Sequence, residues 1–90
     1  MPSKKYNIEG IEIEFEPYDS EDSAAKRRFL SYCFKMIREE SGMSRTDFAS
    51  WLGIPYRTMQ EWELGRRAMP EYLLRLIAYK VYNENLKYSH

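Results

Sequence analysis

The chain has few residues of the types that catalyse reactions or hold metal ions. Its only cysteine is Cys33, and its only histidine is His90, the last of the 90 residues. A single cysteine allows neither an internal disulfide nor a multi-cysteine zinc site. No nucleophile–base pair and no glycine-rich phosphate loop can be identified in the sequence. We therefore expect no enzymatic activity, no metal site and no other cofactor.

The basic side chains are better candidates for chemistry, and they are unevenly distributed. The formal net charge is zero, yet residues 1–23 carry two lysines against seven acidic residues, a net charge of −5. Residues 24–82 carry eleven Lys or Arg against six acidic residues, a net charge of +5. A basic domain is attracted to phosphates, but an acidic segment weakens that attraction unless it is held away from the binding face.

Length and composition favour one small globular domain. A chain of 90 residues with 43% hydrophobic residues is rich enough in apolar side chains to form a packed core rather than a disordered coil. No apolar run is long enough to cross a bilayer, so no membrane association is expected. The lysines near the N-terminus are not followed by an apolar stretch, which argues against a secretory signal. We expect a cytoplasmic protein.

The N-terminal part of the chain has the pattern of a β element. Residues 11–16 alternate apolar and acidic side chains, the period of a half-buried strand, and Pro17 ends the run. Tyr6 and Ile8, before Gly10, could form a short first arm and so a tight hairpin. We interpret residues 1–23 as an acidic arm with its linker, and residues 24–90 as a separate helical domain.

Helical periodicity predicts four helices in that domain, over residues 24–41, 45–52, 56–64 and 71–85. Gly42 and Gly53 are placed to end the first two helices, and Ser44 to cap the second. Cys33 falls on the apolar stripe of the first helix, where an inert buried thiol is expected. The core stripe of the last helix is predicted to consist of Leu73, Leu76, Ile77 and Val81. The expected fold class is mainly α, with four to five helices and a short N-terminal strand or hairpin.

The second and third predicted helices are joined by only three residues, Gly53 to Pro55. A tight turn with a small residue lets two helices cross steeply, as in a helix-turn-helix. Residues 42–65 read GMSRTDFASWLGIPYRTMQEWELG, and this stretch resembles the core of the Xre, or lambda-repressor-like, family. Residues 37–38 and 70–74 extend the resemblance to more than a third of the chain.

The resemblance implies a lambda-repressor-like fold and sequence-specific binding of double-stranded DNA, as in a transcriptional regulator. The chain looks closest to a small bacterial variant with Ile-Pro in the turn and Pro-Glu-Tyr before the final helix. The family often has Ser or Thr where Pro55 stands, and proline has no capping side chain. That departure allows the start of the third helix to shift by one residue.

Carried over position by position, the resemblance also assigns roles to individual side chains. On the third helix it implies contacts with DNA bases for Tyr56, Arg57, Gln60 and Glu61. It implies contacts with phosphates for Ser44, Arg45, Thr58, Arg66 and Arg67. Arg38 and Glu63 match a partly buried ion pair that braces the first helix against the third. Glu61 could accept a hydrogen bond from cytosine, but its charge repels phosphates.

Two further apolar surfaces suggest contact with a protein. The strand residues Ile11, Ile13 and Phe15, together with a tyrosine flank on the last helix, Tyr72, Tyr79 and Tyr82, could form a homodimer contact or a docking site. The alternative is that the strand folds back and covers these tyrosines within one chain.

Three functions remain open at this point. The first is a DNA-binding regulator. The second is an antitoxin that represses its own operon and neutralises a toxin protein through another surface, for which the acidic strand is a candidate. The third is a protein-interaction module that has kept the fold and lost DNA binding, so that its arginines form an ordinary solvated surface.

Overall fold

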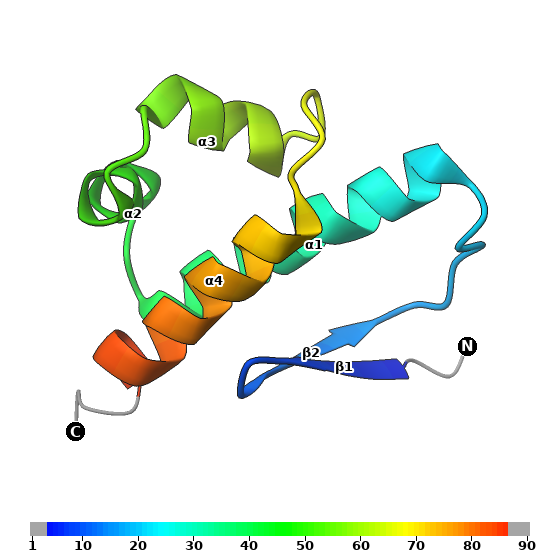
Figure 1. The fold of residues 1–90 in the computed structure, drawn as a ribbon, viewed down its shortest axis with the longest axis horizontal. Coiled ribbons are helices and arrows are strands. Elements are labelled where there is room, and N and C mark those ends of the chain that lie inside the picture. The colour runs from blue at the N-terminus through cyan, green and yellow to red at the C-terminus, as the bar shows by residue number, and fades with distance from the viewer. Residues whose placement is uncertain (1–3, 87–90) are drawn as a thin grey trace.

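The computed structural model describes residues 4–86, and the side chains of residues 4–84, so that His90 lies outside the described part. The chain is mainly helical, with a two-stranded hairpin at its N-terminal end (Figure 1). In chain order the elements are β1 (Lys4–Ile8), β2 (Ile11–Phe15), α1 (Ser23–Ser41), α2 (Arg45–Leu52), α3 (Tyr56–Glu63), α4 (Glu71–Val81) and the π-helical turn η1 (Tyr82–Leu86). The helices begin and end close to the predicted positions, except that regular α-helix stops at Val81.

The expected hairpin forms through a turn of two residues. The strands are antiparallel, with Ile8 opposite Ile11 and Tyr6 opposite Ile13. Both turn residues have positive φ, 50° at Glu9 and 96° at Gly10. This is the backbone of a type I′ turn, whose twist matches that of the flanking strands. Glycine at the second position avoids the steric conflict that a side chain would have there.

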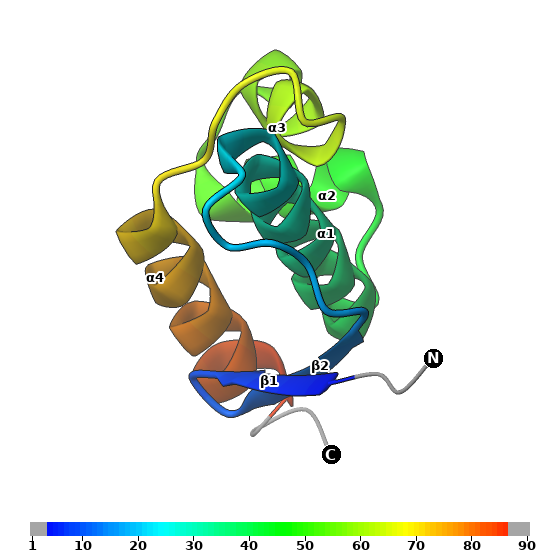
Figure 2. The same ribbon diagram turned by 90° about the vertical axis from the view of Figure 1, so that its right-hand side faces the viewer.

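One face of the hairpin packs against the helical core. Ile8, Ile11 and Ile13 are only 2–3% exposed and belong to the same apolar cluster as the buried residues of α1 and α4. In Figures 1 and 2 the hairpin lies beneath these two helices, at the end of the molecule away from α3. The prediction that Ile11 and Ile13 form an intermolecular surface is therefore wrong, because the chain's own core needs them.

The centre of the core lies between α1, α2 and α3. The ring of Phe34 on α1 lies 5.8 Å, between centroids, from Phe48 on α2 and from Trp62 on α3. Cys33, which precedes Phe34 on α1, is fully buried, as expected, and burial raises the pKa of its thiol to about 12. Because the thiolate is the reactive form, this cysteine is inert at neutral pH.

The core-facing side of α4 differs from the predicted stripe. Leu74, Ile77, Ala78 and Val81 are buried, whereas Leu76 is 61% exposed and Leu73 is only partly buried. Apolar residues occur all around this helix, so periodicity alone did not decide which side faces inward. Leu76 stands on the side opposite the core.

The strand residues and the tyrosine flank of the last helix, which were expected to form one interface, have different environments in the structure. Phe15 packs against Tyr6 and Phe29 within the chain. Tyr72 and Tyr79 remain 70% and 57% exposed. The strand does fold back, as the alternative supposed, but it covers neither of these tyrosines. It reaches Tyr82, whose ring lies directly beneath the hairpin turn at Gly10.

That contact leads to a stability prediction. A Cβ on Gly10 would lie 2.9 Å from the ring of Tyr82, and an alanine at this position would also have to adopt a positive φ. We expect Gly10→Ala to lower the free energy of unfolding, measured by urea denaturation, by about 2–4 kcal/mol. Gly42→Ala is the matched control, because Gly42 has φ 75° and no atom near its Cβ position. The control should lose only about 1–2 kcal/mol, the cost of the left-handed backbone. Equal losses would contradict the proposed contact with Tyr82.

Candidate nucleic-acid interface

The turn between α2 and α3 is built from local signals in the sequence. The Ser44 hydroxyl oxygen accepts a hydrogen bond of 3.2 Å from the backbone N–H of Asp47, which caps α2. Gly53 ends α2 with φ 71°, and the N–H of Ile54 donates to the Ala49 carbonyl at 3.0 Å. Pro55 precedes α3 without a side-chain cap, yet α3 begins at Tyr56 as predicted. The departure at Pro55 therefore causes no shift of the helix start.

The exposed side of α3 carries the residues expected to contact bases. Met59 and Trp62 are buried against α1 and α2 and define the inner side of α3. The outer side contains Tyr56 and Arg57, which are exposed, and Gln60 and Glu61, which are partly buried. We call these four residues the α3 face. Thr58, a predicted phosphate contact, is partly buried and lies beside the α3 face rather than on it.

A buried carboxylate connects the three helices that form the interface. The Glu63 side chain, on α3, is 1% exposed. It accepts a hydrogen bond from Arg38 Nε of α1 at 2.8 Å and one from Arg45 Nε of α2 at 3.2 Å. The predicted pair of Arg38 and Glu63 is confirmed. The hydrogen bond to Arg38 stays strong because the surrounding core excludes water.

Arg45 therefore makes a structural contact, in addition to the contact with phosphate that the family resemblance predicts for it. Its hydrogen bond to Glu63, and then the charge of Glu63, raise the pKa of Arg45 above its usual value, with a smaller contribution from Tyr56. The side chain is still 40% exposed. Arg45 is thus held at the edge of the α3 face in a fixed position, with part of its guanidinium open to solvent.

Two arginines follow α3 in a loop that folds back over it. The backbone N–H groups of Arg66 and Arg67 both donate to the Glu61 carbonyl, at 3.0 and 3.3 Å. The guanidinium of Arg66 also lies 3.9 Å from the Glu61 carboxylate, in an exposed ion pair. Glu61 thus offsets part of the positive charge of this loop, so Arg67 is the less neutralised of the two.

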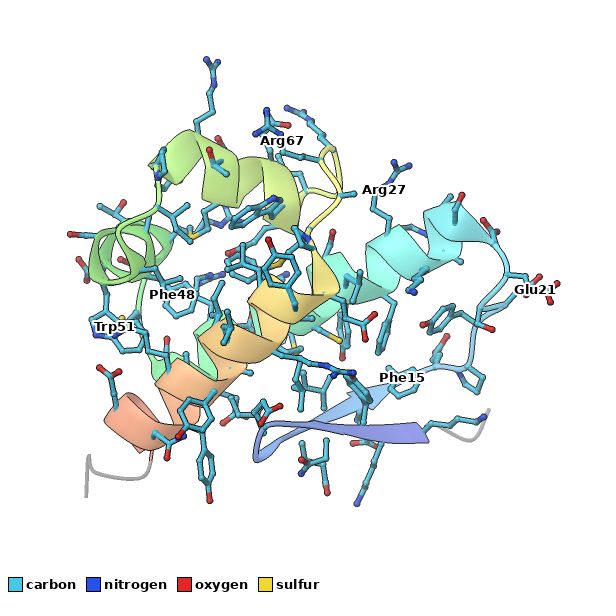
Figure 3. All side chains as sticks on the ribbon, in the orientation of Figure 1. Phe15, Glu21, Arg27, Phe48, Trp51 and Arg67 are labelled. Atoms are coloured by element: carbon cyan, nitrogen blue, oxygen red, sulfur yellow. The ribbon has the colours of Figure 1, made fainter. Side chains whose placement is uncertain are left out.

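Sequence reasoning missed a third arginine near this loop, Arg27 on α1. A Cβ at Gly65 would lie 3.6 Å from the Ser31 hydroxyl oxygen, so the loop passes over α1 at that point. Arg27 stands one turn before Ser31, and Figure 3 shows it pointing to the same side of α1 as Arg67. Its spacing from Arg38, three helical turns, places both on one side of α1 and could have indicated this position.

The acidic residues of the hairpin, and Glu16 directly after it, lie far from the α3 face. Glu9, Glu12, Glu14 and Glu16 are all exposed. Figure 2 shows α3 at one end of the molecule and the hairpin at the other, with α1 and α4 between them. The acidic segment therefore does not cover the α3 face, which is the arrangement that favours attraction of phosphates.

The part of the chain that the structure describes gives no support for a metal site or for a membrane-spanning helix. Residues 4–86 contain no group of three or more His, Cys, Asp or Glu side chains placed to hold a metal ion. Within the same range, no helix combines the length and the apolar character needed to cross a bilayer. Comparison with known proteins gives no match to a family model, to a curated protein or to a solved structure.

The buried carboxylate gives a second stability prediction. Replacing Glu63 by Gln removes the charge that both arginines share, and leaves Arg38 largely buried without its counter-ion. We expect Glu63→Gln to lower the free energy of unfolding by about 3–5 kcal/mol, measured by urea denaturation. Arg45→Ala is the matched control and should cost only about 1 kcal/mol, because its side chain is partly solvated. A loss below about 1 kcal/mol for Glu63→Gln would contradict a bracing role.

Proposed function

We propose that this chain is a lambda-repressor-like protein of the Xre type that binds double-stranded DNA and regulates transcription. The observation that carries the proposal is the α3 face, solvent-exposed and flanked by arginines on both sides. Arg45 lies at one edge, and the loop with Arg66 and Arg67 lies at the other. A protruding helix of this kind fits the major groove of B-DNA.

The residues of the α3 face are suited to contacts with base edges. Arg57 can donate two hydrogen bonds to guanine, and Gln60 can pair with adenine. In the part of the chain that the structure describes, Arg57 takes part in no ion pair, so its guanidinium is available. Glu61 can accept from the amino group of cytosine. Its ion pair with Arg66 reduces the repulsion between Glu61 and nearby phosphates.

The surrounding residues are suited to hold the phosphate backbone. Arginines 45, 66 and 67 carry the charge, and the hydroxyl groups of Ser44 and Thr58 can add hydrogen bonds. Phosphate contacts set the position of a protein on DNA, whereas base contacts supply sequence preference. Arg27 extends the basic surface beyond the residues that the family resemblance implied.

A homodimer would bind two half-sites about one helical turn apart. The outward side of α4, with Tyr72, Leu76 and Tyr79 exposed, is the apolar surface that favours such a contact. In Figure 2 this helix forms a lateral side of the molecule, with α3 at the far end and the hairpin beneath its C-terminal end. A contact there leaves the α3 face free.

A second candidate function is that of an antitoxin, and the position of the hairpin favours it. The acidic residues of β2 are exposed, and β2 lies at the end of the molecule remote from α3. A basic protein partner, such as a toxin, could bind there while α3 remains on DNA. The two functions are compatible, because an antitoxin of this kind also represses transcription.

The proposal predicts different effects for arginines in the two roles. Arg57→Ala should relax the preference at one base pair by about 1–3 kcal/mol while leaving non-specific binding intact. The double change of Arg66 and Arg67 to Ala should weaken binding to all sequences and reduce the salt slope by about 2. The measurement is selection of bound sites from random duplex DNA at two salt concentrations, followed by titration of the selected site.

Lys4→Ala, at an exposed position of β1 on the hairpin remote from α3, is the control and should leave DNA binding unchanged. Equal losses from the Arg57 and the Arg66/Arg67 variants on every sequence would contradict the division between base and phosphate contacts. If the unmodified protein bound no duplex even at low salt, the chain would instead be a protein-interaction module.

A further inference from the structure

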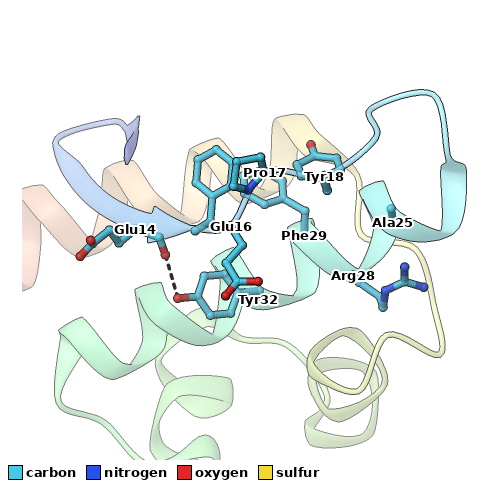
Figure 4. Close-up of a pocket in the computed structure, with 9 residues that line it drawn as sticks. Glu14, Glu16, Pro17, Tyr18, Ala25, Arg28, Phe29 and Tyr32 are labelled. Atoms are coloured by element: carbon cyan, nitrogen blue, oxygen red, sulfur yellow. Dashed lines mark hydrogen bonds between the residues drawn. The ribbon is translucent and has the colours of Figure 1, made fainter. Parts of the chain in front are cut away.

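A groove lined by aromatic rings lies on the side of α1 that faces the N-terminal segment. It is formed by the end of β2, the linker that follows and the first half of α1, and it has a volume of about 520 Å³ (Figure 4). Phe15, Tyr18, Phe29 and Tyr32 supply its rings, and Glu14, Glu16 and Arg28 are its charged residues. We call it the aromatic groove. Its volume is typical of sites for small molecules.

The aromatic wall of the groove is held in place by contacts within the chain. The ring of Phe29 lies 4.7 Å from that of Phe15 and is stacked on that of Tyr18 at 4.9 Å, between centroids. The Tyr32 hydroxyl donates a hydrogen bond of 2.8 Å to the Glu14 carbonyl. Four rings from two segments are thus arranged before any ligand binds, which lowers the entropic cost of binding.

Three charged residues line the groove, and Figure 4 shows the carboxylate of Glu14 directed away from the rings. The other two, Glu16 and Arg28, are of opposite sign and are not paired with each other. Glu16 and Arg28 are both exposed, and neither takes part in an ion pair within the described residues. Figure 4 shows their charged ends apart, on different sides of Phe29, with no bond between them. One groove therefore offers a carboxylate, a guanidinium and an apolar surface as separate groups.

We propose that the aromatic groove binds a free α-amino acid with an aromatic or other large apolar side chain. Such a ligand carries an ammonium group for Glu16, a carboxylate for Arg28 and an apolar body for the ring of Phe29. Arginine recognises carboxylates through paired hydrogen bonds, and stacked rings favour a further ring at their face or edge. Ala25 lines the same groove and has only a methyl group, which leaves room above α1.

The charges argue against a strongly basic peptide as the occupant. Its cations would be attracted by Glu16 but repelled by Arg28, and such a peptide has no carboxylate side chain to pair with the guanidinium. A zwitterion satisfies both charges at once. The site is remote from the α3 face, so binding here does not depend on the proposed function and can be measured without DNA.

The experiment titrates L-phenylalanine into the isotope-labelled protein and follows the backbone amide signals of residues 15–32 by NMR. Saturable shifts confined to this region are expected. N-acetyl-phenylalanine lacks the ammonium group, phenethylamine lacks the carboxylate, and alanine lacks the ring. Each should bind at least about fivefold more weakly than phenylalanine, the effect of losing one partly solvated charged or apolar contact.

Single substitutions test which charged residue of the groove contacts which charged group of the ligand. Arg28→Gln should weaken the binding of phenylalanine by about fivefold. It should leave the binding of phenethylamine unchanged, because that amine has no carboxylate to contact Arg28. Glu16→Gln should weaken the binding of phenylalanine and leave the binding of N-acetyl-phenylalanine unchanged, because the latter has no ammonium group to contact Glu16. Ala25→Leu should fill the groove and weaken every ligand. Arg27→Gln is the matched control, because Arg27 is the preceding residue, about 100° away around α1, and does not line the groove. It should have no effect.

Three results would overturn the proposal. The first is the absence of saturable shifts at millimolar phenylalanine in a protein whose spectrum shows that it is folded. The second is an equal effect of Arg28→Gln and Arg27→Gln. The third is tighter binding by an arginine-rich peptide that phenylalanine does not displace, which would make the groove a docking site for a protein. None of these results bears on DNA binding, so the two proposals succeed or fail separately.

Discussion

The arrangement of the helices depends on the carboxylate of Glu63, which is buried between two arginines. Arg38 belongs to α1, Arg45 to α2 and Glu63 to α3, so one charged group ties together three elements that are distant in sequence. A carboxylate that is 1% exposed keeps its charge only when its oxygens are paired. The apolar contacts of Phe34 with Phe48 and Trp62 hold the same three helices together. The ionic contact adds directional hydrogen bonds, which fix the orientation of α3 more narrowly than apolar packing does.

The hairpin decides how charge is distributed over the molecule. Its strands alternate apolar and acidic residues, and the core takes the apolar side, with Ile11 and Ile13 buried. The acidic side chains of β2 are then exposed. The hairpin that carries them lies at the end of the molecule remote from α3 (Figure 1). A chain with no net charge thereby presents an acidic end and a basic end. The same packing brings Phe15 onto Phe29 and so creates the aromatic groove.

Local signals in the sequence predicted the elements well, and the candidate interface in part. Capping residues, glycines and prolines act over a few residues, so the bounds of α2 and α3 could be predicted from them. The exposed position of Arg57 followed from the period of α3. The second contact of Arg45 could not be predicted in the same way, and the spacing of Arg27 from Arg38 indicated its side of α1 but not the loop that passes over that side. Both depend on where a loop or helix from another part of the chain comes to lie.

The sequence by itself determined the order of the elements, the turn at Gly53–Pro55 and the separation of acidic from basic residues, because these depend on neighbours along the chain. Only the tertiary structure decided which side of α4 is buried, since apolar residues surround that helix and packing had to choose between Leu74 and Leu76. It also decided that the strand serves the chain's own core, and that four rings from β2, the linker and α1 line one groove. Such outcomes depend on contacts between distant segments, which periodicity does not specify.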